Sequence, residues 1–443
     1  MAIATRQELQ NYLELFEGFE KRATAPEFVR KLRQDAFARF WELGFPTLKD
    51  EDWRFTSVAP ITAQTFDLPQ GASVSQSEIE AIVAPELSNR IVFVNGRFAP
   101  ELSVIASAGA KVLSLAEAIG TANPVLQKHL AKHERFESDA FTALNTAFIE
   151  DGAFVHVKRG AVIEQPIYIL YVSTGEKPQM VNPRNLIVAD EQSQAVFVED
   201  YVTLSNRGRT GLESGATVFS NVVTELVAGS DSILSHYMIE REDAKALNVS
   251  TLNVQLARGA NVDSHSLLVG GALVRNNVHP VLAGEGSDCL INGLFVGNER
   301  QHLDNYMKVE HASPHCNSRQ FYNGILDGHS RGVFHGRIIV HKDAQKTDAK
   351  QTNRNLLLSD NAQIDTKPQL EIYADDVKCT HGATIGQMDE EALFYMRSRG
   401  IEEAEARRLL LFAFAGECLD RMKPGPVLDW LRLAVPTWLP AKR

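Results

Sequence analysis

The chain has 443 residues, of which 44% are hydrophobic and 23% charged, a composition ordinary for a soluble globular protein of roughly two or three domains. Its formal net charge of −11 at pH 7 argues against a general nucleic-acid-binding surface, because binding to phosphates needs clustered positive charge. The first residues contain no apolar core of a signal peptide, and no apolar run reaches the ~20 residues that span a bilayer, so we expect a cytoplasmic protein.

Residues 1–140 are expected to form a helical and mixed α+β N-terminal region. Apolar side chains recur at helical spacing from Leu9 to Phe16 and again from Phe28 to Phe40, and Gly44 is a typical helix stop. Further along, Asn95-Gly96 follows a strand-like run and predicts a tight β-hairpin turn. The region contains no pattern typical of a catalytic motif.

Residues 141–386 are expected to form a right-handed parallel β-helix. Short runs of alternating apolar and polar residues predict strands throughout this region. Small polar turns of related sequence recur at Gly229, Gly259, Gly286 and Asp360, and the first three are 30 and 27 residues apart. A recurrence of this length indicates stacked units, and no helical pattern is long enough to serve as a βαβ crossover. A β-sandwich is the alternative all-β interpretation.

The last predicted strand of this core carries Cys379 and His381. Side chains two residues apart on a strand point to the same face, about 7 Å apart. A thiolate and an imidazole are ligands for iron or zinc, but two ligands cannot fill a four-coordinate site. Either a second chain completes the site, or the pair is a buried cysteine beside a hydrogen-bonded histidine. The last rung of a β-helix also exposes an unpaired strand edge, which invites pairing with a partner chain.

Residues 387–443 are expected to be helical. Asp389 is a suitable N-cap for a first helix, and a second helix is predicted from Glu402 to Leu419. The centre of the second helix is apolar on every face and therefore needs cover on more than one side. It is either buried in its own chain or docks a second protein through Leu409, Leu410, Leu411, Phe412 and Phe414.

Other motifs give little support to catalysis. The sequence has no Gly-x-x-x-x-Gly-Lys-Ser/Thr motif, so a partner must supply any ATP hydrolysis. The remaining cysteines are scattered, and no Cys-x-x-Cys pair occurs. Asp375-Asp376 precedes a turn and is expected to be structural. Two histidine groups leave alternatives open: a metal cluster or an ordinary loop at His311, His315 and Cys316, and a solvent-facing stripe or a path to the last rung at His329, His335 and His341.

Six segments carry a family signature: Gly44–Thr56, Gly324–Gly328, Arg331–Gly336, Gln345–Ser359, Asp365–Thr384 and Leu393–Ile401. They resemble the SufD subunits of the SUF iron-sulfur cluster assembly system. The paralogous SufB subunits typically have Glu-His-Glu-Ala-Thr where this chain has the segment from Cys379 to Thr384. They also have Gln-Arg-Gly where this chain has Ser398 to Gly400. Both differences favour the SufD side of the family.

The resemblance implies a non-catalytic scaffold with a helical N-terminal region, a right-handed parallel β-helix and a helical C-terminal region. It implies pairing with a SufB-like paralogue through the last rungs and binding of a SufC-like ATPase through the C-terminal helices. By this resemblance His381 matches a histidine implicated in building the nascent iron-sulfur cluster, with Cys379 beside it and further ligands from the partner. We expect Lys378, a histidine or a metal to lower the pKa of Cys379 from about 8.5.

The same resemblance places the family's main sulfur-accepting cysteine in SufB, so Cys289, Cys316 and Cys418 are not expected to have that role. A flavin is associated with the family's complex, but no flavin motif occurs in this sequence. Two other functions remain open. A homodimer that stores or delivers iron would pair with itself at the open edge. A polysaccharide-active β-helix enzyme would normally be exported and have an aromatic groove, and neither feature is present in the sequence.

Overall fold

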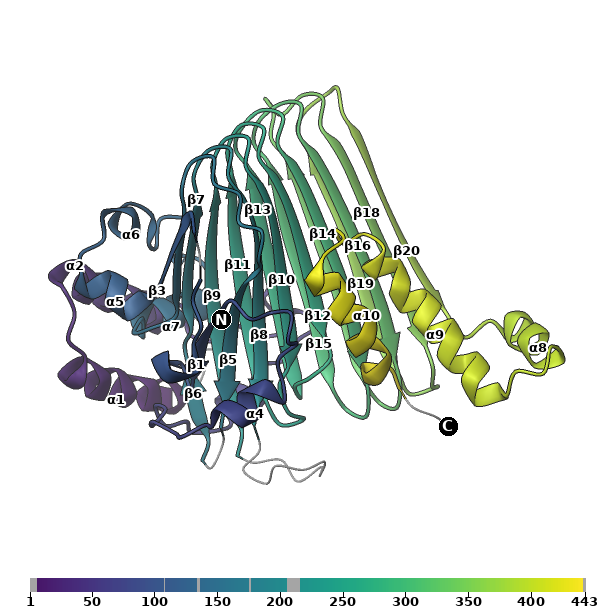
Figure 1. Cartoon of the computed structure of the whole chain (residues 1–443), viewed down its shortest axis with the longest axis horizontal. Coiled ribbons are helices and arrows are strands. Elements are labelled where there is room, and N and C mark those ends of the chain that lie inside the picture. Colours follow the sequence, from purple (N-terminus) through teal and green to yellow (C-terminus); the bar gives the residue numbers. More distant parts are fainter. Residues whose placement is uncertain (1–5, 107, 134–135, 175–176, 205–215, 441–443) are drawn as a thin grey trace.

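The computed structural model describes residues 6–440 apart from 107, 134–135, 175–176 and 205–215, and it is a long β-helix flanked by helices (Figure 1). The helices of the N-terminal region are α1 Arg6–Arg22, α2 Glu27–Leu43, α3 Ala59–Thr62, α4 Gln76–Glu80, α5 Leu115–Gly120, α6 Pro124–His129 and α7 Ala140–Ala147, with 3-10 helices η1 Glu51–Trp53 and η2 Pro100–Leu102. The C-terminal helices are α8 Glu390–Ser398, α9 Glu403–Leu419 and α10 Pro426–Trp438.

Two sheets face each other across the core of the β-helix, and each is named here after its last strand. In order, the β20 sheet contains β2 Arg97–Phe98, β1 Arg90–Val94, β5 Ile167–Ser173, β8 Gln194–Thr203, β10 Ile233–Arg241, β12 Asn261–Leu268, β14 Asp288–Gly297, β16 Asn317–Leu326, β18 Asp348–Leu357 and β20 Lys378–Gly386. The β19 sheet contains β19 Gln363–Ile372, β17 Arg331–Val340, β15 His302–His311, β13 Leu273–Leu282, β11 Leu247–Leu256, β9 Val218–Ala228, β7 Arg184–Ala189, β4 Ala153–Val157 and β3 Ala110–Ser114, with β6 Gln179–Val181 beside β9.

The chain crosses from one sheet to the other at every turn, so each rung contributes one strand to each sheet. Neighbouring strands pair in parallel from β5 to β20 in one sheet and from β4 to β19 in the other. The prediction of a parallel β-helix between helical regions is therefore confirmed, and the sandwich alternative is wrong. The predicted hairpin is also present, since β1 and β2 pair antiparallel around Asn95 and Gly96.

Side chains alternate between the inside of the β-helix and its outer faces. One in-register row of the interior runs through Val262, Cys289, Ser318 and Ala349 to Cys379, and its first four members are buried. Because the rungs stack about 4.8 Å apart, each interior side chain packs on equivalent residues above and below it. The interior is consequently a narrow column of stacked side chains with one rung left uncovered at its end.

Glycines shape three of the corners that lead from a β19-sheet strand to the next β20-sheet strand. Gly259 and Gly286 have φ angles of 64° and 71°, a left-handed conformation that favours glycine. Gly229 lies on the same edge, where an added Cβ would be 2.7 Å from the backbone carbon of Asp190. The fourth predicted turn, at Asp360, lies on the opposite edge because it joins β18 to β19. The four turns grouped by sequence therefore include three corners on one edge of the β-helix and one on the opposite edge.

Helices cover the outer face of each sheet. The N-terminal helices α1, α2 and α7 pack on the first strands of the β19 sheet, and α9 and α10 pack on the β20 sheet. Figure 1 shows α9 and α10 lying along the sheet near β14 and β16, whereas α8 projects beyond β20. Within the described chain, no helix combines the length and apolar character needed to cross a membrane. The domain boundaries at 140 and 386 stay predictions.

Candidate functional site

Cys379 and His381 lie in β20, the last strand of its sheet, and both face the inside of the β-helix. They pair in register with Ala349 and Gln351 of β18, whose side chains are buried. Cys379 packs against the interior core, whereas the His381 side chain is exposed because no further rung covers it in the described structure. The period of two along a strand thus brings the two side chains to one face, as the sequence predicted.

The opposite wall of this open end is formed by β19. Pro368 pairs in register with Gly336 of β17, and Gly336 faces the Gln351 side chain across the interior. By the same stacking, Pro368 stands across from His381 one rung further out. Proline in a strand lacks an N–H for the sheet ladder and is typical of edge strands. The interior of the β-helix is therefore open at the end rung, with Cys379 and His381 on β20 and Pro368 on β19.

Burial raises the pKa of the Cys379 thiol, and the nearby Asp348 carboxylate raises it further. The expectation that Lys378 lowers this pKa is wrong for the chain alone. Successive residues of a strand point to opposite faces, so Lys378 is directed away from the interior. Cys379 is consequently a protonated thiol near neutral pH and must lose its proton to bind a metal.

Among the described residues, no group of three or more His, Cys, Asp and Glu side chains has the arrangement of a metal site. His311 is buried in the core, its Nε2 lies 2.8 Å from Ser318 Oγ, and burial lowers its pKa to about 4. Cys316 lies 3.3 Å from Ser287 Oγ, so both side chains take part in packing of the β-helix. Cys379 and His381 therefore supply two ligands at most, and other groups must complete any metal site.

Two further predicted residues, Asp376 and His335, have structural contacts. Asp376 forms an ion pair with Lys346 of the preceding corner, and its backbone N–H donates to Gln345 Oε1 at 2.9 Å. His335 lies on the outer face of the β19 sheet and contacts the Tyr306 ring at 4.9 Å between ring centres. It is 2% exposed, so it neither faces solvent nor lines the interior that leads to the last rung.

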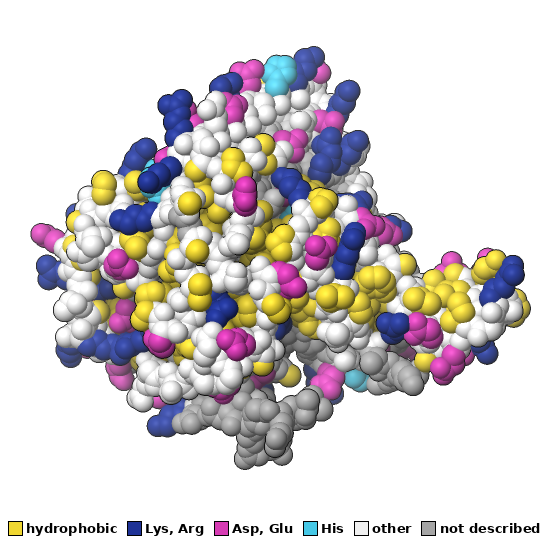
Figure 2. Space-filling model, in the orientation of Figure 1, with side chains coloured by type: hydrophobic (Ala, Val, Ile, Leu, Met, Phe, Trp, Pro, Cys, Tyr) yellow, Lys and Arg dark blue, Asp and Glu magenta, His cyan; other side chains and the backbone are white. Residues whose placement is uncertain are grey.

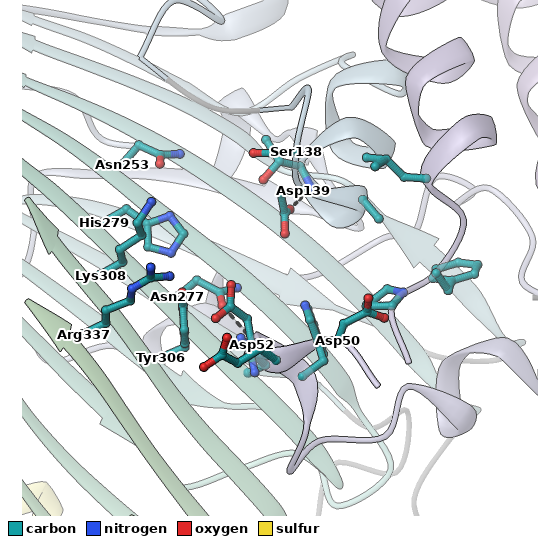
Figure 3. A pocket seen from close by; sticks show the side chains of 18 of the residues that line it. Asp50, Asp52, Ser138, Asp139, Asn253, Asn277, His279, Tyr306, Lys308 and Arg337 are labelled. Atoms are coloured by element: carbon teal, nitrogen blue, oxygen red, sulfur yellow. Dashed lines mark hydrogen bonds between the residues drawn. The ribbon is translucent and has the colours of Figure 1, made fainter. Parts of the chain in front are cut away.

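A cavity of about 430 Å³ lies between the outer face of the β19 sheet and the segment from Gly44 to Trp53. In Figure 3, His279, Lys308 and Arg337 extend from three neighbouring strands toward Asp52 and Asp139. The 29-residue spacing of these three basic residues is the sequence signal for this row, and sequence analysis missed it.

The basic groups at this cavity are matched by carboxylates. Lys308 lies 3.0 Å from Glu310, Arg337 lies 2.6 Å from Glu371, and Arg275 lies 2.5 Å from Asp304. Arg275 also stacks on Trp53 with 4.0 Å to the ring centre. The cavity consequently has no excess of positive charge, and the stacking of Arg275 on Trp53 joins the N-terminal segment to the β-helix.

Of the predicted docking residues of α9, one is buried in the core and the others are partly buried or exposed. Leu411 is 4% exposed and belongs to the core between α9, α10 and the β20 sheet. Leu410, Phe412 and Phe414 are partly buried, and Leu409 is 37% exposed. The apolar helix is therefore mainly covered by its own chain, and hydrogen bonds from Asn292 and Asn323 to the carbonyls of Cys418 and Phe414 hold it there.

Larger exposed apolar side chains lie on the neighbouring helices. Phe394 and Tyr395 on α8 are 71% and 59% exposed. Figure 2 shows hydrophobic side chains on the projecting part of the molecule formed by α8. This surface continues from the exposed edge of α9.

The comparison with known proteins agrees with this architecture. The family model "SUF system FeS cluster assembly, SufBD core domain" matches residues 171–414, and "SufBD protein N-terminal region" matches residues 6–169. The chain belongs to the SufBD family. Within it, the chain is similar to the iron-sulfur cluster assembly protein SufD of Escherichia coli, with 31% identity over 94% of this chain and 93% of the relative.

Other SufBD relatives cover the chain to a similar extent. A SufBD family protein of Synechocystis is 32% identical over 91% of this chain and 89% of its own length, and the SufD protein of Bacillus subtilis is 24% identical over 92% and 93%. The chain is therefore a SufD-type protein of the SUF system for iron-sulfur cluster assembly.

Proposed function

We propose that this SufD-type chain is a non-catalytic scaffold subunit that pairs with a SufB-like paralogue through β19 and β20. The observation that carries the proposal is the open end rung. There, β19 and β20 are the edge strands of their sheets, and β20 presents Cys379 and His381 on its inner face. An uncovered strand edge favours pairing with strands of another chain, which would bring additional ligands up to these two side chains.

At this interface His381 would supply an imidazole and Cys379 a thiolate to the nascent iron-sulfur cluster. Both are ligand types of iron-sulfur centres, and the partner must complete the coordination. The transient cluster is the cargo of the assembly reaction. A flavin forms no part of this proposal, because no described feature of the chain supports one.

The C-terminal helices are the proposed docking surface for a SufC-like ATPase. The proposal includes Leu409, Leu410, Phe412 and Phe414, with Leu411 as the core residue that fixes the helix beneath them. The exposed apolar side chains of α8 extend this surface, and apolar patches of this kind often mark protein interfaces. ATP hydrolysis by the docked subunit would then drive opening of the shared interface.

The deciding experiment replaces His381 with alanine in the assembled complex after anaerobic expression with its paralogue and ATPase. We expect a loss of most of the cluster, measured as iron and acid-labile sulfide per complex. Thr380→Ala is the matched control, because Thr380 lies on the same strand and faces the other way. An unchanged cluster content in the His381 variant, with the complex intact, would show that the ligand role is wrong.

The homodimer remains a second candidate because the same open strands allow a second copy of the chain to pair there. Its molecular mass measured over a range of concentrations, with and without the paralogue, separates the two pairings. Membership in an iron-sulfur assembly family leaves the polysaccharide-active alternative without support.

A further inference from the structure

Two glutamine side chains lie inside the last rungs of the β-helix, where Asn353 and Asn355 are also buried. Gln320 and Gln351 are each 2% exposed, and Gln351 Nε2 donates to Gln320 Oε1 at 2.7 Å. The other ends of these amides, Gln320 Nε2 and Gln351 Oε1, are buried without a partner in the described chain. A buried polar atom without a hydrogen bond costs about 1–3 kcal/mol, so such atoms require an explanation.

The two amides form a row with His381. Gln320 pairs in register with Gln351, and Gln351 pairs in register with His381, so the three side chains stack on the inner face of β16, β18 and β20. Neighbouring members of the row are one strand spacing apart, about 4.8 Å. The row therefore ends at the side chain to which the proposed function assigns cluster ligation.

The facing sheet leaves room for this row. A Cβ atom on Gly336 would lie 1.8 Å from Gln351 Nε2 and 2.9 Å from Gln320 Oε1. Only glycine fits at this position of β17 while the amides keep their places. Gly336 thus makes space for the two glutamine side chains, and no apolar side chain packs at its position.

We propose that Gln351 is a positioning residue for His381: its Oε1 accepts the ring N–H when the imidazole turns toward the interior. This inference rests on the proposed function of His381. A ring nitrogen that donates to a neutral amide leaves the lone pair of the other nitrogen available to a metal. Gln320 holds the Gln351 amide in orientation through its own hydrogen bond. The buried oxygen gains its missing partner, and the ring is held in one tautomer at the mouth of the β-helix.

The test uses the full-length chain labelled with ¹⁵N-histidine, with the His381 signal assigned from the His381→Ala variant. In Gln351→Glu a carboxylate replaces the amide beside the ring, and we expect the titration midpoint of His381 to rise by about one pH unit or more. Asn353→Asp is the matched control, because Asn353 is also buried on the inner face of β18 but pairs with Ala383. An equal response to both changes, or no response to either, overturns the inference.

A second variant guards against a folding defect in Gln351→Glu. Gln351→Met keeps the approximate volume and removes the acceptor, so the ¹⁵N shifts of His381 should move toward those of a free histidine ring. A wild-type tautomer distribution in a folded Gln351→Met protein also overturns the inference. In the assembled complex, Gln351→Met should lower cluster content about tenfold or more, as is typical for loss of a residue that orients a metal ligand.

The two proposals fail in different ways. The titration and the tautomer are measured on metal-free protein, so they report the contact between Gln351 and His381 whatever the cluster chemistry. If His381→Ala leaves the cluster content unchanged, the ligand role fails even where the contact is observed. If the ligand role holds and neither Gln351 variant affects the ring, only the positioning role fails.

Discussion

Buried polar side chains occur inside the β-helix near both of its ends, and Glu199 near the first rungs is more fully hydrogen-bonded than Gln351 near the last. Near the first rungs, the Glu199 carboxylate accepts hydrogen bonds from Tyr201 at 2.6 Å and Thr224 at 2.8 Å, and lies 3.1 Å from His236 Nε2. Near the last rungs, Gln320 and Gln351 share one hydrogen bond and leave two atoms unpaired within the described structure.

The pKa of Glu199 reflects this difference. Burial alone would raise the pKa of the carboxyl, but the hydrogen bonds from His236, Tyr201 and Thr224 outweigh it and lower the pKa. His236 Nδ1 is buried without a partner in the described chain, but both oxygens of the Glu199 carboxylate are bonded, and such bonding stabilises one conformation. In the row at the other end, Gln351 Oε1 has no partner in the described chain, and the inference above assigns it the ring N–H of His381. The first rungs, which the N-terminal helices cover, are called the closed end here, and the uncovered last rung is the open end, where the proposed function places assembly.

Breaking the closed end should give the largest effect on stability. Arg184 and Glu225 are both fully buried and lie 2.7 Å apart on the outer face of the β19 sheet, where the N-terminal region covers them. Arg184→Ala leaves the Glu225 carboxylate buried without its cation, and we expect the free energy of unfolding to fall by about 3–5 kcal/mol in urea titrations. Arg159→Ala is the control, since its exposed pair with Glu191 should contribute less than about 1 kcal/mol. Similar losses in the two variants would contradict the view that the closed end holds the fold.

Gly336→Ala tests whether the space beside the glutamine pair is as restricted as the structure indicates. We expect a loss of about 1–3 kcal/mol in unfolding free energy, because the new methyl group overlaps the Gln351 amide. The loss should be largely reversed when Gln351→Ala is added, so the two changes should be strongly non-additive. Gly382→Ala is the control on β20, where no atom of the described chain lies within 4 Å of an added Cβ.

The sequence predicted the β-helix and the shared face of Cys379 and His381, because both follow from a strand period of two. It could not place these residues above Gln351, because successive rungs differ in length. Along the row that ends at His381, the in-register steps are 29 residues from Ile291 to Gln320, then 31 and 30. No constant repeat aligns the rungs, so the register and the glutamine row emerge only from the pairing of whole strands.

The same limitation explains the errors in side-chain environment. Lys378 is next to Cys379 in sequence but faces the other way, so it does not lower the thiol pKa. The apolar run in α9 predicted a helix with several covered faces, but not that Leu411 packs against its own β-helix. Local sequence defines a strand or helix, whereas which face is covered depends on elements far along the chain.

The open end should show pH-dependent metal binding. Burial and Asp348 raise the pKa of Cys379, so the thiol is protonated at neutral pH and must release a proton on binding iron. Affinity for Fe²⁺ in the anaerobic complex should therefore rise with pH below that pKa, by up to about tenfold per pH unit for one released proton. Cys379→Ala should remove this part of the pH dependence. A wild-type slope that is unchanged in the variant would show that Cys379 is not a ligand.

The smallest stability effect is expected at the exposed edge of the end rung. Ile385 on β20 is 52% exposed, so Ile385→Ser should change the free energy of unfolding of the isolated chain by less than about 0.5 kcal/mol. Pairing with a second chain would bury this side chain, and loss of a buried isoleucine contact should weaken association about tenfold or more. Analytical ultracentrifugation of the chain alone and with its paralogue measures both pairings. If the variant is less stable but associates as the wild type does, Ile385 stabilises the fold and does not belong to the interface.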